Sequence, residues 1–197
     1  MFTGIITDLG RLQSIAPGSA TRLVVETLYD TDTIAHGASI ACSGVCLSVV
    51  DKGPGWFAVD VSAETLSCTT IGSWASGQPI NLERPLRLGD ELGGHLVSGH
   101  ADGVGEVTAR QPDGDSVRYR FRVPAPLARF IAPKGSVAVD GVSLTVNEVM
   151  GDQFGVNLIP VTLRETGLGR LALGQGVNLE IDMLARYLAR LMSKDEA

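Results

Sequence analysis

Short stretches in which hydrophobic and polar residues alternate recur along the chain. In the clearest of them, Val117, Tyr119, Phe121 and Val123 alternate with three arginines, directly after a Pro-Asp-Gly-Asp turn. A period of two places one face of a strand on a core and the other in water. Similar stretches, bounded by Gly, Pro and Asp, are residues 22–27, 39–42, 45–51, 56–61, 137–139, 142–149, 154–159 and 177–181. The pattern predicts antiparallel strands.

The chain also repeats itself. Residues 44–49 read GVCLSV and residues 141–146 read GVSLTV, a separation of 97 positions. Over residues 43–84 this shift gives 16 identities in 42 positions, whereas average composition predicts roughly one in 15 by chance. We interpret this match as a domain duplication.

The repeat is long enough for each copy to fold alone, unlike the units of about 20 to 50 residues in solenoids and propellers. About six short strands per copy are too few for a full sandwich, so each copy is expected to form a small closed or nearly closed barrel. We expect the first domain at residues 1–95 and the second at residues 96–182.

The C-terminal residues 183–197 have a different character. Leu184, Leu188 and Leu191 lie on one stripe at helical spacing, and Asp182 stands at the N-cap position. The sequence predicts a helix whose stripe must pack on something, since a helix this short is marginal alone. Packing on its own barrel and self-association with other copies are equally consistent with the spacing.

Composition and charge exclude some classes of function. A net charge of -6 and a pI near 5.0 argue against a nucleic-acid partner and give no reason to expect an anionic membrane surface. The N-terminus lacks the features of a signal peptide and no apolar run reaches the ~18 residues of a membrane span, so a cytoplasmic location is expected. Three cysteines, all in the first half, favour reduced thiols over disulfides.

Several motifs occur together in order: the MFTGII start, the two related hexamers, GGHLVSGH at residues 93–100 and Glu-Ile-Asp at residues 180–182. In this combination, over nearly the whole chain, the sequence resembles the riboflavin synthase family, whose members carry duplicated lumazine-binding domains. The resemblance implies an all-β fold of two homologous six-stranded antiparallel Greek-key barrels plus a C-terminal α-helix that joins three subunits into a homotrimer.

The resemblance also implies an activity. Similar enzymes convert two molecules of 6,7-dimethyl-8-ribityllumazine into riboflavin and 5-amino-6-(D-ribitylamino)uracil by transfer of a four-carbon unit, without a cofactor or metal. Each active site forms between the first domain of one subunit and the second domain of a neighbour. Holding two identical molecules face to face would itself supply much of the rate gain.

The substrate-binding residues implied by the resemblance fall into three groups. The first pocket is lined by Cys46, Leu47, Ser48, Asp60, Val61, Ser62, Ala63, Glu64 and Thr65. The second is lined by Ser143, Leu144, Thr145, Asn157, Leu158, Ile159, Pro160, Val161 and Thr162. Residues lent across the interface are Gly4, Ile5, Ile6, Gly99, His100, Ala101 and Lys134. Without the resemblance, structural roles are favoured: Leu47 and Leu144 as barrel core, Lys134 as a solvated turn residue.

The candidate catalytic residues are His100, Ser143, Cys46, Thr145, Asp182 and Phe2. The reaction begins with removal of a proton from the donor's 7-methyl group, and a histidine that titrates near neutral pH can carry that proton. We expect the second pocket, with Ser143 and His100, to activate the donor. Cys46 is a candidate nucleophile or polarisable contact, and capping of the last helix would explain Asp182 equally well.

Two positions depart from the family pattern. Val161 stands where the first copy has Glu64, which removes a candidate ligand for the ribityl hydroxyls from the second pocket. Ser48 stands where the family often has Thr, a change that keeps the hydroxyl.

Two alternatives belong to other functional classes. A lumazine- or flavin-binding protein without activity could use the same duplicated barrel. A metal site formed by His95, His100 and a cysteine ranks far lower, because no third ligand lies nearby in the sequence.

Overall fold

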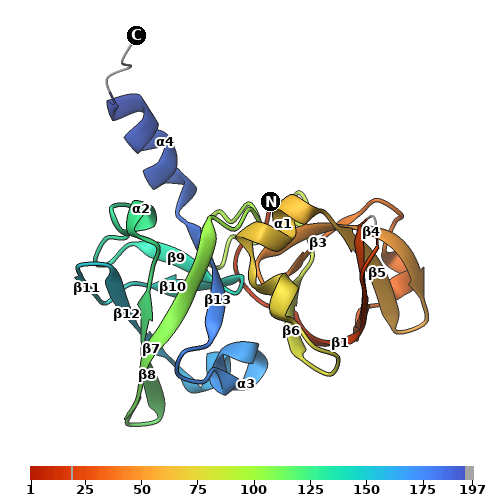
Figure 1. Ribbon diagram of the computed structural model, residues 1–197, viewed down its shortest axis with the longest axis horizontal. Coiled ribbons are helices and arrows are strands. Elements are labelled where there is room, and N and C mark those ends of the chain that lie inside the picture. The colour runs from red at the N-terminus through yellow and green to blue at the C-terminus, as the bar shows by residue number, and fades with distance from the viewer. Residues whose placement is uncertain (19, 194–197) are drawn as a thin grey trace.

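The computed structural model describes residues 1–18 and 20–193. Two β-barrels of similar size lie side by side, and a C-terminal helix projects away from the second (Figure 1). The N-terminus lies between the two barrels (Figure 1). The predicted all-β fold with a C-terminal helix is confirmed.

The first barrel is closed, with strand order β1-β2-β5-β4-β3-β6. Its strands are β1 (Asp8–Ala16), β2 (Thr21–Glu26), β3 (Ser39–Cys42), β4 (Val45–Gly53), β5 (Trp56–Val61) and β6 (Pro79–Glu83). Helix α1 (Ala63–Cys68) and the 3-10 turns η1 (Thr31–Thr33) and η2 (Thr70–Ser73) lie in the connections. The step from β2 to β3 passes over two strands, as a Greek key requires.

The second barrel repeats this order with one strand divided, β10-β9-β13-β7-β8-β12-β11. It is a seven-stranded sheet that stays open between β10 and β11, so the prediction of six strands holds only for the first barrel. Its strands are β7 (Gly103–Asp113), β8 (Ser116–Arg122), β9 (Ser136–Val139), β10 (Val142–Thr145), β11 (Glu148–Met150), β12 (Gln153–Leu158) and β13 (Gly176–Ile181). The connections carry α2 (Ala125–Ala128), α3 (Pro160–Glu165) and η3 (Gly167–Arg170).

The prediction of a single strand over residues 142–149 is therefore wrong. β10 and β11 together correspond to β4, and they separate at Val146 and Asn147. In β4 the pairing with β5 shifts at the equivalent place, between Val49 and Asp51. Both barrels thus have an irregularity at this point, and in the second it is large enough to divide the strand.

Each barrel has its own apolar core. The alternation in residues 117–123 is confirmed in β8, where Tyr119 and Phe121 are fully buried. Their rings stack with centroids 5.9 Å apart, and Phe121 also contacts Phe154 at 5.4 Å. The arginines Arg118 and Arg122 on the opposite face pair with surface carboxylates. The first core contains Phe57, which corresponds to Phe154 in the duplication.

The segment that precedes each barrel crosses to the other barrel. In the first leader segment, residues 2–6, the carbonyl of Gly4 accepts a hydrogen bond of 2.8 Å from the Ser143 N–H on β10. In the second leader segment, residues 97–101, the carbonyl of Gly99 accepts one of 2.8 Å from the Cys46 N–H on β4. Ile6 packs against the second core and Ala101 against the first. Each barrel is thus completed by residues that precede the other.

Two asparagines, equivalent in the duplication, join the barrels near their approximate two-fold axis. Asn81 on β6 donates from Nδ2 to the Asp140 carbonyl, and Asn178 on β13 donates from Nδ2 to the Ser43 carbonyl, both at 2.9 Å. Both side chains are almost completely buried, so each bond satisfies an amide that would otherwise be costly to bury.

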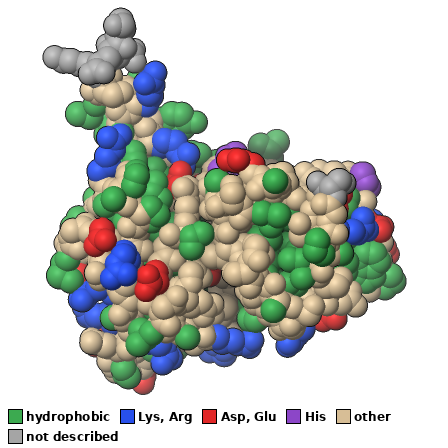
Figure 2. Space-filling model, viewed as in Figure 1, with side chains coloured by type: hydrophobic (Ala, Val, Ile, Leu, Met, Phe, Trp, Pro, Cys, Tyr) green, Lys and Arg blue, Asp and Glu red, His purple; other side chains and the backbone are tan. Residues whose placement is uncertain are grey.

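Helix α4 (Met183–Met192) begins at Asp182, whose carboxylate caps it by accepting from the Leu184 N–H at 2.9 Å. No residue of α4 is buried, and the helix stands clear of the barrels with apolar side chains on its surface (Figure 2). The stripe is not packed on its own barrel: Leu184, Leu188 and Leu191 are 67%, 59% and 84% exposed. Residues 194–197 of the predicted helical segment lie outside the described residues. Among the described residues, no helix is both long and apolar enough to cross a membrane.

Candidate functional site

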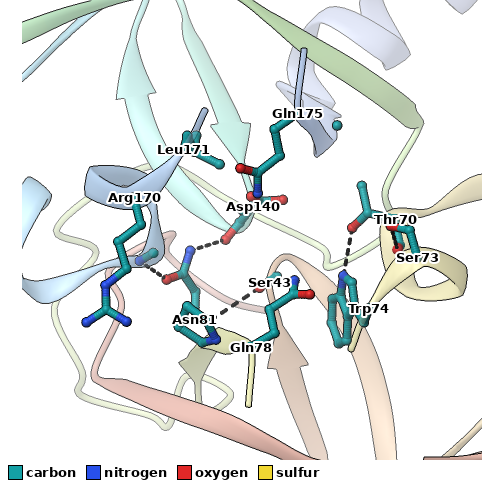
Figure 3. Close-up of a pocket in the computed structure, with 13 residues that line it drawn as sticks. Ser43, Thr70, Ser73, Trp74, Gln78, Asn81, Asp140, Arg170, Leu171 and Gln175 are labelled. Atoms are coloured by element: carbon teal, nitrogen blue, oxygen red, sulfur yellow. Dashed lines mark hydrogen bonds between the residues drawn. The ribbon is translucent and has the colours of Figure 1, made fainter. Parts of the chain in front are cut away.

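A cavity of about 300 Å³ lies between the barrels (Figure 3). It is lined by polar residues from both copies, among them Gln78 and Asn81 from the first and Asp140 and Gln175 from the second. None of the residues predicted from the sequence to bind substrate lines this cavity. Its position near the approximate two-fold axis indicates a junction between the barrels.

Asp140 is a carboxylate that lines this junction. Its Oδ1 accepts a hydrogen bond of 2.7 Å from the Asn178 N–H. Burial raises the pKa of Asp140 to about 7, and this hydrogen bond opposes the rise. A carboxyl group whose pKa is higher in the folded than in the unfolded state stabilises the fold most at low pH, and that contribution is lost as pH rises toward about 7.

Replacing Asp140 with asparagine is expected to remove this pH dependence. The amide oxygen can still accept from Asn178, but it carries no charge to bury. Relative to the wild type, the free energy of unfolding of Asp140→Asn should increase by about 2 kcal/mol between pH 5 and pH 8. Urea titrations at both pH values measure the change, with the exposed Asp115→Asn as control. Parallel pH dependence of Asp140→Asn and the wild type would contradict the assignment.

A pocket of about 260 Å³ lies on the first barrel at the start of β4. Of the predicted substrate-binding residues, it brings together Cys46, Glu64, Thr65, Gly99, His100 and Ala101. The first three come from β4 and α1, and the last three from the second leader segment. We call this the Cys46 pocket. It is built from both domains of a single chain.

The other residues predicted for the first pocket lie around it without lining it. Leu47 and Val61 point into the first core, while Ser48, Asp60, Ala63 and Ser62 are exposed. Ser62 caps α1 by accepting from the Thr65 N–H at 3.1 Å. The prediction that Leu47 belongs to the barrel core is therefore confirmed. Ser62 stabilises the start of the helix that carries Glu64.

The equivalent position on the second barrel, at Ser143, has a different histidine. Nδ1 of His95 lies 2.7 Å from the Ser143 hydroxyl oxygen, and the first leader segment reaches the same strand at Gly4. His100 lies at the Cys46 pocket instead. Within one chain, the expected combination of Ser143 with His100 is therefore not formed.

His95, which the sequence suggested only as a metal ligand in a low-ranked alternative, was not among the predicted catalytic or substrate-binding residues. It is half-buried, and burial lowers the pKa of its imidazole, against the opposing charges of Asp182 and Glu180. Its Nε2 is buried without a hydrogen-bond partner among the described residues. A neutral imidazole beside a serine hydroxyl can accept a proton. The signal in the sequence was its position in the GGH run that precedes the second leader segment.

The remaining predicted residues occupy varied positions. Ile5, Thr145, Lys134, Asn157, Ile159, Pro160 and Val161 are exposed, Ile6 and Thr162 are partly buried, and Leu144 and Leu158 belong to the second core. Lys134 has a positive φ of 68° in a turn closed by the hydrogen bond from the Gly135 N–H to the Ala132 carbonyl at 2.9 Å, and it donates its own N–H to the Val146 carbonyl at 2.7 Å. Phe2 is fully buried against Val97, Ala41 and Ala138 between the barrels.

Metal ligation receives no support from the side chains. Within residues 1–18 and 20–193, no group of three or more His, Cys, Asp or Glu side chains is arranged to hold a metal ion. His95 and His100 are directed to different barrels, at Ser143 and Cys46 respectively.

Comparison with known proteins agrees with this architecture. The lumazine binding domain family matches the chain twice, over residues 3–85 and 98–182. The riboflavin synthase of Brucella abortus is 55% identical over 197 residues, covering 97% of this chain and 98% of the relative. That of Mycobacterium tuberculosis (strain H37Rv) is 46% identical, covering 98% of each chain. Among solved structures, LumP complexed with riboflavin has a TM-score of 0.83 at 25% identity, covering 92% of this chain and 99% of LumP. The chain belongs to the riboflavin synthase family and carries one lumazine-binding domain in each half.

Proposed function

We propose that this protein catalyses the reaction for which its relatives are named. Two molecules of 6,7-dimethyl-8-ribityllumazine react, a four-carbon unit passes from one to the other, and riboflavin and 5-amino-6-(D-ribitylamino)uracil are formed without a cofactor. One observation carries the proposal: Cys46 and Ser143 occupy equivalent strand positions of the two barrels, and each has a histidine from the segment before β7, His100 in the Cys46 pocket and His95 at Ser143. Two similar but chemically different positions suit two identical molecules in different roles.

The pair of His95 and Ser143 is proposed to activate the donor. The low pKa of His95 leaves its imidazole neutral near pH 7, so it can accept the proton lost from the 7-methyl group. Ser143 holds the imidazole by its hydroxyl group. The resulting negative charge is delocalised over the ring, and hydrogen-bond donors at the site would stabilise it. His100 and Cys46 are assigned to the molecule that accepts the four-carbon unit.

The active protein is proposed to be a homotrimer in which the Cys46 pocket of one subunit faces the Ser143 site of a neighbour. The exposed stripe of α4 supports this, because five large apolar residues of one short helix would otherwise face water: Leu184, Tyr187, Leu188, Leu191 and Met192. A groove of about 500 Å³ between α4 and Phe130 adds further apolar surface. A cytoplasmic location remains a prediction.

Replacing Leu188 with glutamate is expected to dissociate the trimer and to lower kcat by at least tenfold, because a buried unpaired charge is costly at an interface. Sedimentation velocity measures the assembly, and thermal unfolding tests whether the barrels remain intact. Leu28→Glu, at a residue of the first barrel that is 92% exposed, is the control and should change neither assembly nor kcat. A Leu188→Glu variant that stays trimeric would show that α4 is not the interface.

The reaction itself is tested by mixing the purified protein with 6,7-dimethyl-8-ribityllumazine in the presence of a chelator and separating the products by chromatography. Riboflavin and the pyrimidine are expected in equal amounts. Bound but unchanged lumazine would instead identify a binding protein, with Val161 as the first position to restore to glutamate. Absence of both binding and turnover would refute both functions.

A further inference from the structure

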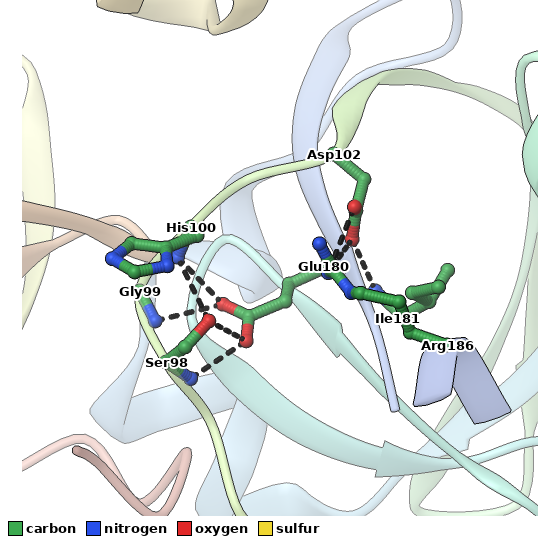
Figure 4. Close-up of polar contacts among 7 residues, drawn as sticks. All are labelled: Ser98, Gly99, His100, Asp102, Glu180, Ile181 and Arg186. Carbon is green, nitrogen blue, oxygen red and sulfur yellow. Dashed lines mark hydrogen bonds and ion pairs between the residues drawn. The ribbon is translucent and has the colours of Figure 1, made fainter. Parts of the chain in front are cut away.

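The last strand of each barrel carries, at or next to its final position, a buried glutamate that holds a leader segment. Glu180, the penultimate residue of β13, is only 2% exposed. Its Oε1 accepts hydrogen bonds from the N–H and hydroxyl of Ser98, at 2.6 and 2.7 Å. Its Oε2 accepts from the N–H groups of Gly99 and His100, at 2.8 and 3.0 Å (Figure 4). Four donors from three consecutive residues therefore converge on one carboxylate.

The segment held by Glu180 forms one wall of the Cys46 pocket on the opposite barrel. The Gly99 carbonyl accepts from the Cys46 N–H, so the peptide fixed by Glu180 is itself bonded to the cysteine's strand. Gly99 has a φ of +78°, and a Cβ at this position would lie 2.6 Å from Cβ of Cys46. Because the two residues are so close, a small displacement of the segment would also displace Cys46.

We propose that Glu180 is a positioning residue for the Cys46 pocket: it sets the places of Gly99 and His100 although it belongs to the other barrel and lies outside the pocket. The inference deepens the proposed function, on which its kinetic part rests. Misplacement of catalytic groups by about 1 Å can cost up to a hundredfold in rate. Glu180 thus acts on the reaction through the second leader segment.

A carboxylate is required here because every partner is a donor. Each oxygen takes two hydrogen bonds, which uses the acceptor capacity of both. A glutamine in the same place would keep one oxygen, but its NH2 group would face two further donors. Either Ser98 or the Gly99–His100 peptide would then lose its partner, at the cost of a buried unsatisfied group.

The first copy has the same arrangement for the Ser143 site, which supplies a matched comparison. Glu83, at the end of β6, accepts from the N–H and hydroxyl of Thr3, at 2.6 and 2.7 Å, and from the Gly4 N–H at 2.9 Å. The Gly4 carbonyl in turn accepts from the Ser143 N–H. Each glutamate therefore holds the wall of a site on the barrel to which it does not belong, and the two variants should affect different sites.

The test uses the full-length protein with Glu180→Gln, Glu83→Gln and, as a control for loss of an exposed carboxylate, Glu106→Gln. Hydrogen exchange followed by mass spectrometry reports on the leader segments, and the rate of Cys46 alkylation by iodoacetamide, read from its peptide, reports on the pocket. Glu180→Gln should speed amide exchange in residues 98–100 at least tenfold, change Cys46 alkylation at least threefold and lower kcat about tenfold. Glu83→Gln should speed exchange in residues 3–5 and leave Cys46 alkylation unchanged.

Conservative replacement separates positioning from a general loss of stability. Glu180→Asp keeps both carboxylate oxygens on a side chain one methylene shorter and should recover part of kcat. Ser98→Ala removes one donor from outside β13 and should change Cys46 alkylation in the same direction as Glu180→Gln, by a smaller factor. If Glu180→Gln does not fold, Ser98→Ala decides the question.

Wild-type alkylation of Cys46 in a folded Glu180→Gln or in Ser98→Ala would overturn the proposal. Both structural readouts are independent of turnover. A wild-type protein that makes no riboflavin would therefore refute the proposed function while the exchange and alkylation rates still decide the role of Glu180.

Discussion

Replacement of His95 by glutamine is expected to lower kcat by about a hundredfold, the usual contribution of a general base. Glutamine can still hydrogen-bond to Ser143, which lies 2.7 Å from Nδ1 of His95, but it cannot accept a proton at neutral pH. KM should change little, because the loss concerns proton transfer more than substrate binding. Steady-state kinetics of riboflavin formation measure both parameters.

The effect should be coupled to Ser143. If the two side chains act as one unit, the double variant His95→Gln/Ser143→Ala should lose little more activity than His95→Gln alone. His36→Gln, at an exposed histidine outside both sites, serves as the control and should retain wild-type kcat. Full activity of His95→Gln would show that another group is the general base.

Replacement of Gly141 by alanine is expected to lower the free energy of unfolding by about 3 kcal/mol. Gly141 has a φ of +79°, and a Cβ there would lie 2.7 Å from the backbone nitrogen of Gly44. Gly44 in turn has a φ of +80°, and its Cβ would lie 2.6 Å from the nitrogen of Gly141. Because backbone meets backbone, no side-chain rotation can relieve the clash, and the two barrels would have to move apart. Urea unfolding measures the loss.

Gly37 provides the matched control. It has the same φ of +79°, but a Cβ there would meet nothing within 4 Å. Gly37→Ala should therefore lower the free energy of unfolding only by the backbone strain, about 1 kcal/mol. The difference between the two variants isolates the contact between the barrels. Equal losses for Gly37→Ala and Gly141→Ala would mean that the close approach costs nothing.

The sequence predicted most of the strands because they follow a two-residue period or are rich in β-branched residues. It did not single out β1 or β7, in which Gly10 and Gly105 interrupt the pattern, or β6, whose residues after Pro79 are buried on both faces and show no two-residue period. The division between β10 and β11 left a signal that the prediction did not use. The apolar positions run from Val142 to Val146 in steps of two, and the next, Val149, follows after three. Such a change of phase is what an irregularity in the pairing requires.

The candidate site was harder to predict for a physical reason. Alternation along a strand reports which residues face a core, but it carries no information about which barrel a leader segment touches. His95 and His100 are only five residues apart, yet they serve opposite barrels, because the chain passes from Ser143 on one to Cys46 on the other within that distance. Cys46, Glu64 and Thr65 were predicted for one pocket and do line one, whereas His100 was expected beside Ser143 and lies with Cys46 instead.

The exchange of leader segments also bears on how a two-domain chain of this kind could arise. Two separate copies that exchanged their leader segments in this way would form a domain-swapped dimer. Such pairing depends on protein concentration. Joining two copies in tandem makes the exchange intramolecular, at an effective concentration that dilution cannot change. The two copies can then diverge, so that one strand carries Cys46 and the other Ser143, which identical swapped partners could never do.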